Sequence, residues 1–99
     1  MTLYQLLSTL NIPVSYGLFT NPPALPYLCI IGAGQEHFEA DSTYYVKRDN
    51  WQIELYFKVK DPDVEESIED LLLSNGYKYE KSEDVYIENE GIFMVFYDI

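Results

Sequence analysis

The sequence is poor in the residues on which most catalytic and metal sites depend. Its 99 residues include one cysteine, Cys29, and one histidine, His37. A single cysteine excludes an intramolecular disulfide, and one cysteine with one histidine is too few for a structural zinc site. A catalytic pair is disfavoured because Cys29 lies in an apolar run, where a thiolate is costly. The sequence therefore favours a protein that is not an enzyme and uses no cofactor or metal.

Basic residues are also scarce. Six lysines and arginines stand against 17 aspartates and glutamates, which gives a formal net charge of −11. Such a surface repels nucleic acid, whose binding depends on Lys and Arg displacing counterions. The acidity serves either solubility or the passage of a polyanion that must not stick. No apolar run approaches the roughly 20 residues of a membrane span, and no basic residues precede the N-terminal apolar positions, so we expect a cytosolic protein.

The glycines are spaced wrongly for a phosphate-binding turn. Residues 30–35, IIGAGQ, look like a strand that enters a dinucleotide-binding loop, but His37 occupies the place of the third glycine. The residues that follow have no helical period. We therefore expect Gly32 and Gly34 to form a turn between strands. The segment 30–41 is then expected to be a loop that reaches toward another protein.

Two amphipathic helices are expected. Leucines recur at helical spacing from Leu3 to Leu10, which predicts a helix over about 2–11. The second helix spans about 62–75, between a good N-cap at Asp61 and a closing glycine at Gly76. Its expected apolar stripe is Val64, Ile68, Leu71 and Leu72. The carboxylates expected to face water are Glu65, Glu66, Glu69 and Asp70.

Alternation of apolar and polar residues predicts the strands. It is strongest in residues 51–59, WQIELYFKV, and a shorter buried strand is expected at 27–31. Two more strands follow the second helix, around a turn at 88–91, and the last of them is apolar on both faces. We therefore predict one domain over residues 1–99. Its fold is α+β, an antiparallel or mixed β-sheet of about four to five strands with two helices packed on one face.

The last strand and the aromatic residues suggest contacts with a partner. A lone domain buries one face of such a strand easily and the other with difficulty. Ten tyrosines, five phenylalanines and one tryptophan are more than a small core usually absorbs, and interfaces favour aromatic residues. The residues expected at subunit contacts are Phe93, Val95 and Tyr97, with Tyr44, Tyr45 and Trp51 as weaker candidates.

The order of several short motifs resembles a known family. The motifs are PYL at 26–28, ADSTYY at 40–45, QIELYFKVKDPDVEESIED at 52–70 and YEKSEDVYIENE at 79–90. Together they resemble small proteins encoded among the tail genes of long-tailed phages and prophages of Gram-positive bacteria. These proteins are called tail completion, tail terminator or head-to-tail joining proteins. The resemblance covers residues 26–99.

The resemblance implies a virion assembly protein without catalytic residues. Such proteins form a hexameric ring on the finished tail tube, stop its growth and present a surface to the head connector. The implied partners are other copies of the chain, the major tail tube protein and the head connector, with DNA passing through without specific binding. The implied location is the host cytoplasm during assembly and then the head-tail interface of the virion. The alternative from the residues alone is a small acidic regulatory protein that mimics DNA.

Overall fold

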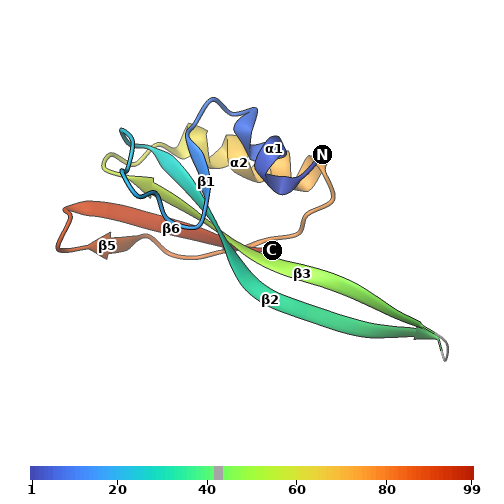
Figure 1. Ribbon diagram of the computed structural model, residues 1–99. Helices are drawn as coiled ribbons and strands as arrows, with labels where there is room; N and C mark the ends of the chain where they lie inside the picture. The colour runs from blue at the N-terminus through green and yellow to red at the C-terminus, as the bar shows by residue number, and fades with distance from the viewer. Residues whose placement is uncertain (42–43) are drawn as a thin grey trace.

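The computed structural model describes residues 1–41 and 44–99, without the side chains of residues 40–45. The described part forms a six-stranded mixed sheet with two helices, which confirms the α+β class (Figure 1). The sheet order is β1-β2-β3-β6-β4, with β5 also paired to β6, and only the β1–β2 pair is parallel. The elements are α1 (Leu3–Ser8), β1 (Val14–Tyr16), β2 (Tyr27–Asp41), β3 (Tyr44–Phe57), α2 (Pro62–Ser74), β4 (Glu80–Lys81), β5 (Val85–Ile87) and β6 (Ile92–Asp98).

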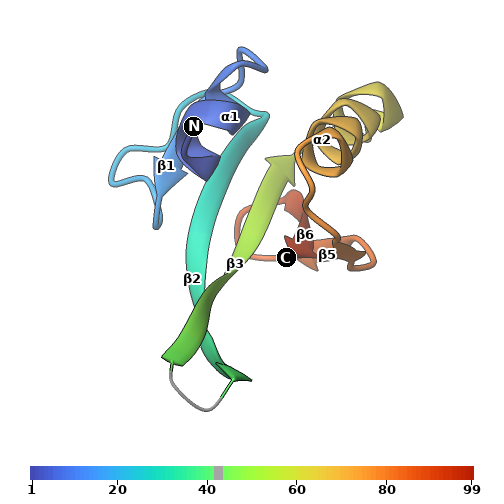
Figure 2. The ribbon, with the colours of Figure 1, turned by 90° about the vertical axis from the view of Figure 1, so that its right-hand side faces the viewer.

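Both helices lie on the same side of the sheet, as Figure 2 shows from a second direction. The core fills the space between them and the sheet, and it draws on every long element of the body. Its most deeply buried members are Leu7, Leu28, Ile30, Ile53, Leu55, Ile68, Leu72, Val95 and Tyr97. None of the helices in the described residues is long and apolar enough to cross a membrane.

The main helix, α2, begins and ends where the sequence predicts. The Asp61 side chain accepts hydrogen bonds from the backbone N–H groups of Asp63 and Val64. At the other end, Gly76 has a φ of 82°, and the Tyr77 N–H donates to a carbonyl in the last helical turn.

The first helix is shorter than expected. Thr2 caps it through a reciprocal pair of hydrogen bonds with Gln5, but the helix ends at Ser8 rather than at residue 11. The hydroxyls of Ser8 and Thr9 donate to carbonyls of the preceding turn, which weakens continuation of the helix. Asn11 then takes a left-handed conformation with a φ of 59°.

The expected turn at the glycines is wrong, because β2 continues through them for 15 residues. Between the pairs Gly32–Trp51 and Gln35–Asp49, β2 contains one residue more than β3. This β-bulge uses the left-handed φ of 97° at Gly34, which favours glycine. A glycine in a strand marks a bulge as readily as a turn, and local sequence does not separate the two.

Beyond the bulge, β2 and β3 leave the rest of the sheet as a two-stranded ribbon (Figure 1). We call its described part, residues 35–39 and 46–50, the arm, and the remainder of the chain the body. The arm makes the molecule elongated, with dimensions of 51 × 27 × 24 Å. The segment expected to be a loop is therefore half of a projecting hairpin.

Two further details at the sheet edge differ from expectation. The alternation predicted over residues 51–59 stops at Phe57, and Val59 is 79 % exposed instead of buried. The single strand expected before the last turn is divided into β4 and β5, which both pair with β6. Between them the Ser82 hydroxyl accepts a hydrogen bond from the Phe96 backbone N–H.

Candidate functional site

The arm is the part of the chain with the least burial. Every described residue from 32 to 39 and from 46 to 49 is exposed. Phe38 and Val46 lie directly opposite each other in the ladder and are 50 % and 44 % exposed. A two-stranded ribbon is marginally stable in water without packing on a third element. The arm therefore presents an apolar pair, Phe38 with Val46, where the body offers it no cover.

Charged residues flank this apolar pair. Glu36 lies opposite Arg48, two positions along each strand, and so shares a face with Phe38. His37 lies opposite Lys47 on the other face, with a ring nitrogen 2.6 Å from the Gln35 side-chain oxygen. The arm thus combines an apolar centre with charges of both signs.

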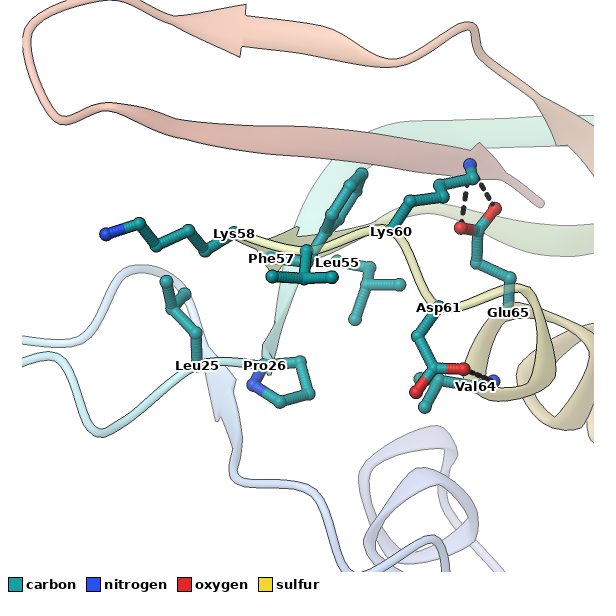
Figure 3. Close-up of a pocket in the computed structure, with 10 residues that line it drawn as sticks. Leu25, Pro26, Leu55, Phe57, Lys58, Lys60, Asp61, Val64 and Glu65 are labelled. Carbon is teal, nitrogen blue, oxygen red and sulfur yellow. Dashed lines mark hydrogen bonds and ion pairs between the residues drawn. The ribbon is translucent and has the colours of Figure 1, made fainter.

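A groove lies at the opposite end of β3, where the strand runs into α2 (Figure 3). We call it the end groove, and its volume is about 310 Å³. Leu25 and Pro26 form one wall, and Phe57 of β3 also lines the groove, with its ring turned toward β6. The other lining residues are Leu55, Lys58, Val59, Lys60, Asp61, Val64 and Glu65. It is an apolar hollow with charged groups at its rim.

A cluster of charges fastens α2 to the sheet edge beside this groove. The Glu65 side chain is 2 % exposed, and its carboxylate lies 2.7 Å from the Nζ atoms of both Lys60 and Lys81. Lys60 also pairs with Asp84 at 3.0 Å. Burial alone would lower the pKa of Lys60, but its hydrogen bonds to these carboxylates outweigh that effect and the pKa is raised. The prediction that Glu65 faces water is wrong, because two lysines cover it: Lys60, which precedes α2, and Lys81, which lies on β4.

Glu69 extends the cluster by one helical turn. It accepts hydrogen bonds from the hydroxyls of Tyr97 at 2.8 Å and Tyr79 at 3.3 Å, and it pairs with Lys81 at 2.9 Å. Burial would raise the pKa of Glu69, but these partners outweigh it and the pKa is lowered. The pKa of Tyr97 is raised, first by burial and then by its bond to the carboxylate. These groups pair with one another inside the fold, which favours a structural role for the cluster.

The sheet face that lies away from both helices is partly covered. Tyr27 stacks on Tyr56 with ring centroids 5.0 Å apart, and Phe19 packs edge-on against Tyr27. Burial raises the pKa of both tyrosines. Met94 and Phe96 of β6 belong to this face and are half-buried. It is the second face of the last strand that the sequence marks as apolar.

Two of the expected subunit contacts lie inside the body. Val95 and Tyr97 are completely buried and belong to the core under α2, so neither side chain is available to a partner. The sequence shows that β6 has two apolar faces but does not show which of them the helices cover. Phe93 is half-buried and stacks on Phe57, which lines the end groove.

The weaker contact candidates lie near the arm. Trp51 lies at the base of the arm, is half-buried and packs against Tyr16, with ring centroids 6.0 Å apart. The side chains of Tyr44 and Tyr45 fall outside the described residues.

The two residues considered for catalysis do not meet. Cys29 is completely buried in the body part of β2, and burial raises the pKa of its thiol. His37 is eight residues further along the same strand, which at about 3.3 Å per residue separates them by about 26 Å. Among the described residues, no three His, Cys, Asp or Glu side chains are grouped so as to hold a metal ion.

No protein-family model matches the chain, and no curated protein matches its sequence.

The arm pair and the buried carboxylate are the residues that sequence reasoning missed. Phe38 and Val46 each stand singly among polar residues, and only their pairing across the ladder makes them one patch. Glu65 carried a usable signal, since it lies three and seven residues before Ile68 and Leu72 and so borders the apolar stripe.

Proposed function

We propose that this chain is a phage virion assembly protein, a tail terminator or completion factor. It caps the tail tube as a ring and joins the tail to the head. DNA passes through the ring without specific binding. The protein performs no catalysis and uses no cofactor. Its partners are other copies of the chain, arranged as a hexameric ring, the major tail tube protein and the head connector. It acts in the host cytoplasm during assembly and stays at the head-tail interface.

The observation that carries this proposal is the arm. The chain extends two strands well beyond its own core and places an exposed apolar pair on them. Such a ribbon gains stability when it packs on another molecule, which is what a protein of an ordered assembly requires. The resemblance in the order of motifs, from PYL to YEKSEDVYIENE, supports the same role.

The distribution of charge supports a ring more than a DNA mimic. Eleven of the 17 acidic residues lie between positions 61 and 90, on α2 and the adjoining edge of the sheet. The ion pairs of Lys81 with Glu65 and Glu69 hold these two parts together. A mimic of DNA needs two rows of carboxylates on one face, whereas a ring around DNA needs them gathered toward one edge. In this proposal the acidic edge faces the passage, where it repels the DNA backbone.

Electron microscopy of lysates from the source phage or prophage, with this gene deleted, tests the proposal. Full heads beside free tails, some of them longer than normal, are the expected result. Complementation with the intact gene restores joined virions. Normal virions from the deletion strain would contradict the tail role and favour the small acidic regulator.

A further inference from the structure

The arm and the end groove lie at opposite ends of one strand, β3. Val46 is on the arm and Phe57 lines the groove, and both belong to β3. They are eleven positions apart in the strand, which is about 36 Å at about 3.3 Å per residue. The arm of a copy therefore cannot fold back into the groove of the same copy. An arm that fills this groove must therefore belong to a second molecule.

The two surfaces match in size and in chemistry. The groove has a volume of about 310 Å³, and a cavity of about 150 Å³ already accepts benzene, so one aromatic ring and an aliphatic neighbour fit. Leu25, Pro26 and Phe57 give it apolar walls, and Phe38 with Val46 gives the arm an apolar patch of similar kind.

The charges beside the two surfaces are also complementary. Glu36 and Arg48 flank Phe38 on the arm, and Lys58 and Asp61 stand at the rim of the groove. Lys58 points out of the groove toward solvent (Figure 3). Its exposed position makes it available to a carboxylate of a neighbour, in a chain whose net charge of −11 otherwise opposes contact between copies.

We propose that the arm of one copy docks in the end groove of a second copy, with Phe38 as the side chain that enters the groove. The contact joins two different surfaces, so a docked pair still has one free groove, on the first copy, and one free arm, on the second copy, for further neighbours. Repetition of such a head-to-tail contact closes into a ring when the rotation between copies allows it. This inference rests on the self-assembly in the proposed function and names the surfaces that carry it.

Two variants block the contact from opposite sides. Phe38→Asp places a charge on the arm, and Val59→Asp places one in the groove, at residues that are 50 % and 79 % exposed. Both variants should fold, which thermal unfolding checks, and Phe38→Ser replaces the first if its folding is impaired. Leu73→Asp is the matched control, since it also removes an exposed apolar side chain, on the outer part of α2.

Sedimentation velocity measures the association state of each variant. Protein concentrations up to about 1 mM are used, because a contact with a dissociation constant in that range is then about half formed. The intact chain and Leu73→Asp should associate, and each blocking variant alone should stay monomeric. Their equimolar mixture should stop at a dimer, because one intact arm and one intact groove remain. A monomeric intact chain, blocking variants that still associate, or a mixture that stays monomeric would each overturn the inference.

Disulfide trapping locates the contact directly. Phe38→Cys and Val59→Cys, mixed and oxidised, should form a dimer of the two different variants, while the intact Cys29 stays unreactive because it is buried. Absence of the mixed dimer would contradict the docking. These tests are independent of the virion phenotype. Free tails in the deletion strain without a mixed dimer in vitro would support the tail role and contradict this contact. A mixed dimer together with normal virions would support the contact and contradict the tail role.

Discussion

The body and the arm share the same two strands and differ in what their side chains meet. In the body, Leu28 and Leu55 are directly paired and lie under the helices with at most 2 % exposure. In the arm, Phe38 and Val46 are paired in the same way and remain about half exposed. The apolar residues of the body are explained by the core of the chain itself. Those of the arm lie outside that core, and we propose that a second molecule covers them.

The largest effect is expected in the body, at Tyr97. Tyr97→Asp places a carboxylate in a completely buried site beside Glu69, and we expect a loss of about 5 kcal/mol, comparable with the whole unfolding free energy of a small domain. Circular dichroism during urea unfolding measures it. Tyr97→Phe is the control, because it keeps the ring and removes only the hydroxyl. A folded, monomeric Tyr97→Asp protein would show that this side chain is a surface contact after all.

A smaller loss is expected where the charge cluster holds α2 to the sheet edge. Glu65→Ala removes the carboxylate shared by Lys60 and Lys81, and we expect a cost of about 2 kcal/mol, since both lysines are partly exposed and can turn to water. Glu66→Ala is the matched control on the next, exposed position and should change stability by less than about 0.5 kcal/mol. Equal effects of the two substitutions in urea unfolding would contradict the buried role of Glu65.

The same cluster predicts a dependence on acid. The pKa of Glu69 is lowered from its ordinary value of 4.5, so its contribution is present above that pH and is lost as the pH falls through the lowered value. Because the site is at the surface, we expect at most about 1 kcal/mol from this group. Unfolding free energies measured from neutral pH down to acid should fall less steeply in Glu69→Gln than in the intact chain. Parallel curves would rule out this contribution.

The smallest effect on stability is expected in the arm. Phe38→Asp replaces a side chain that is 50 % exposed and lies outside the core, so the unfolding free energy should stay within about 0.5 kcal/mol of the intact chain. Thermal unfolding of the dilute monomer measures it. A loss of several kcal/mol would show that the arm belongs to the folding unit of the body and that its side chains stabilise the monomer as the core does.

Local rules in the sequence predicted the elements of the body well. Asp61 and Gly76 bound α2 because capping depends on only a few neighbouring residues. The alternation from Trp51 to Phe57 predicts a strand because one of its faces is buried. The choice of which face of β6 meets the helices is a tertiary property, so Tyr97 was assigned to the wrong side.

The arm was missed for a related reason. A strand that buries neither face leaves no periodic signal, and Gly34 at the bulge gives the same local signal as a turn. The end groove is assembled from Pro26, in the segment before β2, Phe57 of β3 and Val64 of α2, which lie far apart in the sequence. Such a site appears only when the chain is folded.

Hydrogen exchange, followed by mass spectrometry at low and high protein concentration, shows whether the arm is covered only when copies of the chain associate. We expect body amides around Leu28 and Leu55 to exchange slowly at both concentrations. Arm amides around Phe38 and Val46 should exchange fast when the protein is dilute and become protected when it is concentrated, together with the groove segment at Val59. Protection of the arm that does not change with concentration, in a chain that stays monomeric, would contradict assembly through the arm.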